Sequence, residues 1–250
     1  MIDNFNVIDE FLLFREGYFY KFEALVRNTD GPNPLYYEGI SNTNKNILIK
    51  NWFIDNEEYY EKMKSQMKAL CDMTGARLYV TLDRKENNKL IECIYDKSNE
   101  MMKGLVHGVN YGTKKIKKVV SSCSSLVECS DKSSKTLMFD VDSKDKLALE
   151  IVKLYLTEKE VKYYVLNTRQ GYHIVCYKKF DTKNLNTDIV KCYSNFLDRY
   201  DVIPKCDRPP LVDRADSYVR NYIRVNPNQL GLVYHPEKNF INDDGNERKL

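Results

Sequence analysis

The spacing of apolar residues divides the chain into segments of helical and of strand character. Residues 1–30 are rich in apolar and aromatic side chains and predict one or two helices, which the Gly-Pro-Asn-Pro run at 31–34 ends. The apolar run at 47–54 is typical of a strand. Asp55 or Asn56 is then placed to cap a helix. The chain therefore begins with elements of both types.

A helix is predicted to follow Asn56, because its apolar side chains recur on one face and Gly75 is a suitable terminator. Residues 77–84 alternate between apolar and polar positions and predict a strand. Residues 88–104 predict a further helix. The residues that share the face of the first helix are Tyr60, Met63, Met67 and Leu70.

A polar stretch separates the two halves of the chain. It consists of a basic run at 114–118 and a Ser-rich stretch at 121–134, and it is the best candidate for a boundary. We expect an N-terminal α/β module at residues 1–125 and a second module at residues 126–250.

The second half has a cleaner pattern of alternating strands and helices. The order strand, helix, strand, strand, helix, strand predicts an antiparallel sheet with helices on one side. This is an α+β fold with a core like that of an RNA-recognition motif (RRM). The predicted strands are 136–142, 161–166, 172–177 and 218–225, and the predicted helices are 147–156 and 183–200.

The composition is that of a folded protein, with 42% hydrophobic and 30% charged residues among 250. No apolar stretch approaches the ~20 residues that cross a bilayer, and no signal peptide is recognisable. We therefore expect a cytoplasmic protein with no membrane partner. The net charge of +3 neither demands nor excludes nucleic acid, so a basic face has to be local. Seven cysteines without a Cys-x-x-Cys pair predict reduced thiols and no zinc site.

The first candidate for chemistry is an acid pair at the end of a predicted strand. Alternation puts Asp140 and Asp142 on one face, with Phe139 and Val141 on the other. Two close carboxylates repel each other unless a divalent cation lies between them, and hard oxygen ligands favour Mg²⁺ or Mn²⁺. The alternative is a pair of solvated aspartates on an edge strand.

The second candidate is the segment from Thr168 to Val175, which predicts a tight turn that leads through Gly171 into a strand. Arg169 and His173 are both suited to bind an anion such as a triphosphate. The alternative is that His173 is a structural residue of the sheet.

The third candidate is Asp213, which follows a Leu-Val pair that we expect to form an apolar strand or turn. Asp207 and Asp216 compete with it, but both have the polar surroundings of a loop. A later strand delivers Arg224 into an Asn-Pro-Asn turn. The alternative is an ordinary loop acid and a surface arginine.

Taken together, the three candidates resemble the motifs of the archaeo-eukaryotic primase (AEP) superfamily, the catalytic domain of primases and primase-polymerases. The family motifs are a strand-borne acid pair, a Ser/Thr-x-x-Gly-Tyr/Phe-His segment, and a third acid after an apolar residue. A later segment resembles the Arg-Ile/Val-Pro-Gly-Thr segment of phage and plasmid members, with Asn-Pro-Asn in place of Pro-Gly-Thr. The matching positions are Asp140 and Asp142, 168–173, Asp213 and 222–227, within a resemblance that covers roughly residues 45–235.

The resemblance implies a two-module AEP fold that forms one catalytic domain. It also implies DNA-directed nucleotidyl transfer that makes or extends primers on a single-stranded DNA template. Two divalent ions, Mg²⁺ or Mn²⁺, would activate the attacking 3′-hydroxyl and neutralise the leaving pyrophosphate. The implied partners are nucleoside triphosphates, the template and a separate replicative helicase, in a bacterial cell or an infected host cell.

The resemblance also implies a role for each matching residue. The lysines of the basic run would follow the nucleic-acid backbone, although such a run is also typical of a solvated face. Arg84 is a further candidate for the lining of a cleft. The catalytic and metal-binding residues would be Asp140, Asp142 and Asp213, the nucleotide-binding residues His173, Arg169 and Arg224, and the nucleic-acid-binding residues Lys114, Lys115, Lys117, Lys118 and Arg77.

A rival interpretation is a non-catalytic module that binds single-stranded nucleic acid. RRM-like sheets stack bases on exposed aromatic side chains, and the second half is rich in tyrosine. A pure binding sheet has no need of an acid pair, which repels phosphate. A third interpretation is hydrolysis or another phosphoryl transfer, which the sequence does not separate from polymerisation. The tyrosines concerned are Tyr163, Tyr164, Tyr172 and Tyr177.

Overall fold

The computed structural model divides the chain into two compact units, each with its own helices and antiparallel strands, so the fold class is α+β as predicted. Unit 1 consists of Met1, Leu12–Lys135 and Val233–Leu250, and unit 2 of Ile2–Phe11 and Thr136–Leu232. The described residues are 1–27, 46–112, 115–116, 118–142, 146–177, 184–225, 230–236, 239–241 and 247–249, without the side chains of 127, 134, 196–200, 211–216, 239–241 and 247–249.

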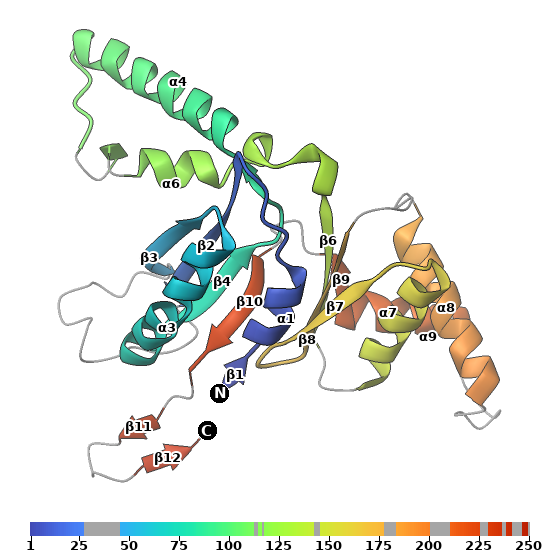
Figure 1. The fold of residues 1–250 in the computed structure, drawn as a ribbon. Coiled ribbons are helices and arrows are strands. Elements are labelled where there is room, and N and C mark those ends of the chain that lie inside the picture. Colours follow the sequence, from blue (N-terminus) through green and yellow to red (C-terminus); the bar gives the residue numbers. More distant parts are fainter. Residues whose placement is uncertain are drawn as a thin grey trace. The chain divides into compact units, whose positions relative to one another are not determined.

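The sheet of unit 1 is built around strand β2 (Tyr18–Val26), which pairs antiparallel with β3, β4 and β5. In the strand order β2 lies between β4 and β3, and helix α3 (Glu57–Thr74) packs on these three strands (Figure 1). The other strands here are β3 (Ile47–Ile54), β4 (Arg77–Thr81) and β5 (Lys85–Glu86), while β11 (Asn239–Ile241) and β12 (Glu247–Lys249) pair with each other in a separate sheet. Strand β1 (Ile2–Asp3) belongs to unit 2, and β10 (Leu230–His235) contains the division at Leu232/Val233.

Strand β2 corrects the prediction of helix over residues 1–30. Among residues 1–27, which the structure describes, only α1 (Phe5–Phe11) is helical, and the aromatic segment from Tyr18 onward is a strand. Residues 19–22 are all buried, because β2 lies between β3 and β4 and is covered on both faces. A strand that is buried on both faces does not alternate between apolar and polar residues. The aromatic run of β2 therefore lacked the two-residue period that predicts a strand. The breaker run at 31–34 lies outside the described residues.

The predicted cap of α3 is confirmed as Asn56. Its backbone is extended, and its side-chain oxygen accepts a hydrogen bond of 2.8 Å from the Tyr59 N–H. Gly75 ends the helix with a positive φ of 65°, a conformation that glycine adopts without strain.

We expect Asn56→Ala to destabilise unit 1 by about 0.5–2 kcal/mol, since the Tyr59 N–H then loses its partner. Urea unfolding followed by the fluorescence of Trp52, in the adjacent strand β3, measures this loss. Asn56→Asp keeps an acceptor oxygen and should remain close to the parent protein. An alanine variant as stable as the aspartate variant would contradict the capping role.

The Ser-rich stretch is tied to unit 1 by two buried lysines. Lys21 Nζ donates to Ser125 Oγ at 2.8 Å, and Lys85 Nζ donates to Ser130 Oγ at 2.7 Å. Burial lowers the pKa of Lys85. The division between the units therefore lies at Lys135/Thr136, ten residues beyond the expected 125/126. The elements of this part are α4 (Asn87–Val106), α6 (Val119–Ser124), and the short 3₁₀ turns η2 (Val127–Cys129) and η3 (Lys132–Ser134).

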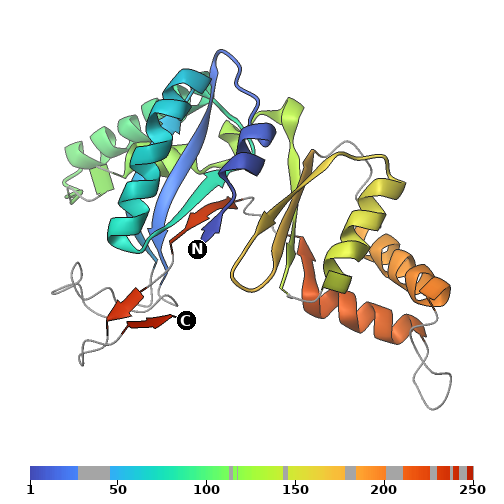
Figure 2. The same ribbon diagram turned by 60° about the horizontal axis from the view of Figure 1, so that its bottom comes forward.

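The sheet of unit 2 has the strand order β7-β8-β6-β9, and all its pairs are antiparallel. Its helices α7, α8 and α9 lie on one side of the sheet (Figure 2). Strands β6 and β8 match their predicted bounds to within one residue. The bounds are β6 (Thr136–Val141), α7 (Lys146–Glu158), β7 (Tyr163–Asn167), β8 (Tyr172–Tyr177), α8 (Leu185–Tyr200), α9 (Leu211–Tyr222) and β9 (Ile223–Val225).

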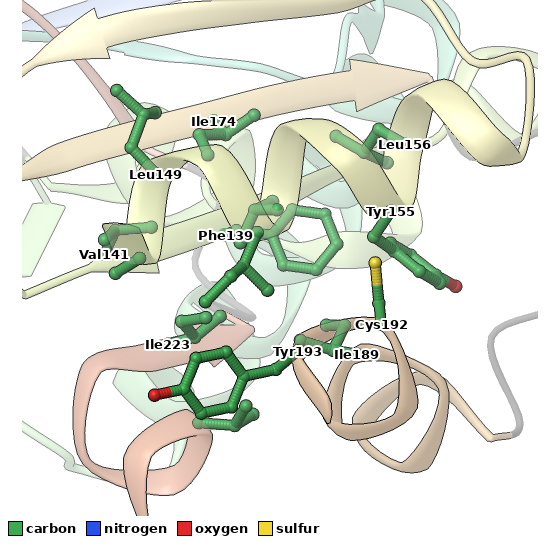
Figure 3. Close-up of a cluster of buried hydrophobic side chains, with 14 of the residues drawn as sticks. Phe139, Val141, Leu149, Tyr155, Leu156, Ile174, Ile189, Cys192, Tyr193 and Ile223 are labelled. Carbon is green, nitrogen blue, oxygen red and sulfur yellow. The ribbon is translucent and has the colours of Figure 1, made fainter. Parts of the chain in front are cut away.

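The core of unit 2 lies between this sheet and its helices. Phe139 and Val141 of β6 are fully buried in it, together with Ile174 of β8 and Ile151 of α7. Figure 3 shows the ring of Phe139 surrounded by side chains from both layers. The face of β6 that carries Phe139 is therefore the face that the helices cover.

The prediction of a strand over residues 218–225 was wrong for most of its length, because α9 continues to Tyr222. Val219 packs into the core, and Tyr218 stacks on Tyr193 of α8 with a centroid distance of 4.9 Å. The β-branched and aromatic residues suggested a strand, but they follow helical spacing. The expected apolar strand or turn before Asp213 is likewise the first turn of α9.

The N-terminal segment packs on the other face of the unit 2 sheet. The Asn4 side chain donates to the carbonyl oxygens of Asn167 and Leu232, both at 2.9 Å. Phe11 of α1 stacks on Tyr177 and meets Tyr164 edge-on. This face is therefore covered on the β7–β8 side. No helix among the described residues combines the length and apolar character needed to cross a membrane.

Candidate functional site

Three predicted site residues form a row across the unit 2 sheet. Asp140 on the central strand β6 pairs with His173 on β8 and with Arg224 on β9. Directly paired residues of antiparallel strands point to the same face of the sheet. Asp142 lies two positions beyond Asp140 and shares that face. The register thus places a histidine on one side of the acid pair and an arginine on the other.

This row lies on the face of the sheet opposite α7, α8 and α9. The neighbours Phe139 and Val141 are buried in the core, which confirms the predicted alternation. The side chain of Asp140 is 27% exposed, that of Asp142 40% and that of Arg224 65%. Exposure thus increases from β8 toward β9, and the acids are reachable from solvent.

Each acid faces one basic side chain. His173 Nε2 lies 3.4 Å from Asp140 Oδ1, and Arg224 Nη1 lies 3.8 Å from Asp142 Oδ2. Both distances exceed the 2.7–3.2 Å that is typical of an N–H···O hydrogen bond. Neither basic side chain therefore makes a close contact with the acids that a ligand would have to break.

His173 is the most buried member of the row, with 11% of its side chain exposed. Its Nδ1 is buried and has no hydrogen-bond partner among the described residues. A buried imidazole with one open nitrogen usually has a ligand or a water as its missing partner.

The predicted turn between Thr168 and Gly171 is confirmed. The Thr168 N–H donates to the Gly171 carbonyl at 2.9 Å, and the Gly171 N–H donates to Thr168 Oγ1 at 3.0 Å. Arg169 is exposed in this turn. The last pair of β6 and β8 is Val141 with Tyr172, so the turn lies at the end of β6 that leads to Asp142.

The third acid is placed only by its backbone. Asp213 lies in the first turn of α9, nine residues before Tyr222, and a helix rises 1.5 Å per residue. Its Cα is therefore about 14 Å along the helix from that of Tyr222, whose carbonyl accepts from the Asp142 N–H at 2.9 Å. Its side chain, like those of Asp207 and Asp216, lies outside the described residues. Among described side chains, no three carboxylate, imidazole or thiol groups gather into a metal site.

The hydrogen bond between the Asp142 N–H and the Tyr222 carbonyl was not anticipated from the sequence. It joins the end of β6 to the point where α9 becomes β9, and so positions both Asp142 and Arg224. Backbone groups carry no residue-specific signal, so this contact could not be found without the strand pairing.

The predicted nucleic-acid-binding residues belong to unit 1. Lys115 and Lys118 are exposed, whereas Lys114 and Lys117 lie outside the described residues. Lys115 Nζ lies 5.0 Å from the centre of the Tyr111 ring. Arg77 is half-buried at the start of β4.

Arg84, the further candidate for the lining of a cleft, makes two contacts within unit 1. Its Nη2 pairs with Asp131 at 2.8 Å, and its Nη1 donates to the Leu13 carbonyl at 3.0 Å. The guanidinium therefore joins the Ser-rich stretch to the segment before β2.

The four tyrosines behind the rival interpretation are not exposed. Tyr164 is buried and Tyr177 is half-buried, and both pack on Phe11. Tyr163 and Tyr172 pack against the helix-covered core. None of them offers a free ring for a base to stack on.

The cysteines of the described chain are free thiols, and most of them are buried. Cys93 is half-buried. Burial raises the pKa of Cys71 and of Cys176 to about 12. The buried cysteines are Cys71, Cys123, Cys129, Cys176 and Cys192.

No family model, no curated protein and no solved structure matched this chain.

Proposed function

We propose that the chain is a nucleotidyltransferase of the AEP type, a DNA primase or primase-polymerase, with unit 2 as its RRM-like catalytic module. The row of His173, Asp140 and Arg224 beside Asp142 is the single observation that carries the proposal. An acid pair with an imidazole on one side and a guanidinium on the other suits a reaction that brings a divalent cation and a polyphosphate together.

The donor set fits a hard divalent cation. Asp140 and Asp142 present carboxylate oxygens on one partly exposed face. Mg²⁺ is commonly held by one or two carboxylates together with substrate phosphates, so these two acids suffice for one ion. When bound, Mg²⁺ or Mn²⁺ would polarise the reacting phosphate and lower the pKa of the attacking hydroxyl. A second ion requires a further ligand, which Asp213 would have to supply.

The residues of the chain have distinct roles in this proposal. Asp140 and Asp142 hold the cation. His173 and Arg224 donate hydrogen bonds to the triphosphate, which is an acceptor-only anion. Arg169, exposed in the turn between β7 and β8, meets the phosphates that extend beyond the sheet.

Incorporation of labelled nucleotides tests the proposal directly. The purified chain is incubated with a single-stranded DNA template, ribo- or deoxynucleoside triphosphates, and Mn²⁺ or Mg²⁺, with and without a primer. We expect labelled products longer than one nucleotide only when metal and template are both present. Release of phosphate from the nucleotides without elongation would indicate hydrolysis and would overturn the proposal.

We expect His173→Ala to raise the apparent KM for nucleotide about tenfold or more, because a charge-assisted hydrogen bond is worth roughly 1.5–3 kcal/mol. The affinity for template should stay within about twofold. Steady-state kinetics and template binding by fluorescence anisotropy measure the two effects separately.

His173→Gln is the matched variant, since its amide still donates a hydrogen bond. It should recover part of the lost nucleotide affinity. Template affinity that falls while the KM for nucleotide stays constant would place His173 against nucleic acid instead.

A further inference from the structure

Helix α4 carries an apolar face that is exposed along its whole length. The helix has no buried residue, and five of its large apolar side chains are more than half exposed. At 100° per residue these five fall within a sector about 100° wide, the width of a helix face that normally packs on a partner. They are Ile91, Tyr95, Met102, Leu105 and Val106, and we call them the α4 stripe.

The opposite side of α4 is the one that packs on unit 1. The helix contacts α6 and η2, and α6 runs below it in Figure 1. The Cys93 thiol, about 180° from the centre of the stripe, is hydrogen-bonded with the thiols of Cys123 and Cys129. Cys129 Sγ also lies 3.7 Å from the Lys89 carbonyl oxygen. The α4 stripe therefore points away from the elements on which α4 packs.

Charges along one edge of the stripe have opposite signs in the two halves of the helix. Glu92 and Asp96 lie in the first half and Lys103 in the second, and all three are exposed. They occupy the same flank, about 80–120° from the centre of the stripe. In an antiparallel helix pair equivalent flanks meet, so Lys103 of one copy comes within a turn of the partner's Glu92 and the partner's Asp96.

We propose that α4 is a self-association helix, whose stripe pairs antiparallel with α4 of a second copy of this chain. With the two-fold axis between Ser98 and Asn99, Ile91 meets the partner's Val106, and Tyr95 meets the partner's Met102. A parallel pair would instead place the acidic halves at the same height. The charge pattern thus complements itself only in the antiparallel arrangement.

The contact is small for a protein interface. A helix of 20 residues is about 30 Å long, and one such pair buries less than the roughly 800 Å² per partner of a standard interface. The dimer should therefore dissociate on dilution. The α4 stripe belongs to unit 1, and self-association through it requires no nucleotidyl transfer.

Sedimentation equilibrium over a hundredfold range of protein concentration tests the proposal. We expect a shift from monomer to dimer, and Tyr95→Glu with Met102→Glu should weaken association at least tenfold. Both positions are exposed, so the double variant should keep the circular dichroism spectrum of the parent protein. Met73→Glu, at an equally exposed methionine of α3, is the matched control and should not change the dimer.

Charge reversal distinguishes the antiparallel pair from other arrangements. Lys103→Glu should weaken the dimer, and Glu92→Lys with Asp96→Lys in the same chain should restore it. A monomer at every concentration would overturn the proposal, as would a dimer that survives Tyr95→Glu with Met102→Glu. Loss of template binding in that double variant without any dimer in the parent protein would assign the stripe to nucleic acid, and it would overturn the proposal as well.

Discussion

Replacing Asp140 with asparagine should reduce nucleotide incorporation by at least about 100-fold while the protein remains folded. A bound cation contributes several kcal/mol of transition-state stabilisation, and each 1.36 kcal/mol is a factor of ten in rate. Asparagine keeps the shape of the side chain but removes the charge that would hold the ion. Because the Asp140 side chain is 27% exposed, the free energy of unfolding should change by no more than about 0.5 kcal/mol.

Two further variants make this result specific. Asp142→Asn should cause a loss of the same order, because both carboxylates are assigned to one ion. Asp188→Asn is the control. Asp188 belongs to the same unit, its side chain is 30% exposed, and its Oδ2 forms only a loose ion pair, 3.8 Å from Lys159 Nζ. Its incorporation rate should equal that of the parent protein. Parent-like activity in Asp140→Asn would contradict the metal-binding role of the acid pair.

Sequence patterns predicted the elements of unit 2 best where one face of an element is buried. Strand β6 shows this, because Phe139 and Val141 alternate with Asp140 and Asp142, and both the strand and its polar face follow from that alternation. Strand β2 has no exposed face, and its sequence therefore does not alternate clearly between apolar and polar residues. Helix α9 was missed because tertiary packing of Val219 and Tyr218 overrides their preference for strands.

The site itself could be predicted only as separate residues. His173 and Arg224 lie 33 and 84 positions after Asp140, and only the pairing of β8 and β9 with β6 shows that they lie on either side of it. Register between distant strands depends on the whole sheet and is not written in a local pattern. The α4 stripe, in contrast, is visible in the sequence, but its exposure is known only once the other side of the helix is seen to pack.

Phe139→Ala should destabilise unit 2 by about 3–5 kcal/mol, because it removes a fully buried ring from the centre of the core in Figure 3. The total stability of a domain is about 5–15 kcal/mol, so this is a large share of it. Hydrogen exchange measured by mass spectrometry gives the effect locally. Peptides that cover 136–141 and 172–177 should exchange faster, since β6 and β8 share this core.

Two matched variants separate the effect on the fold from the effect on the acid pair. Phe22→Ala removes an equally buried ring from β2. It should accelerate exchange in the unit 1 sheet and change exchange in β6 far less. Phe139→Leu leaves most of the apolar volume and keeps Asp140 on its strand. The leucine variant should therefore lose less stability than the alanine variant, and its rate of nucleotide incorporation per folded molecule should equal that of the parent protein. Equal acceleration in β2 and β6 for both alanine variants would contradict the division into two units, and unchanged exchange in β6 for Phe139→Ala would contradict the central place of this ring.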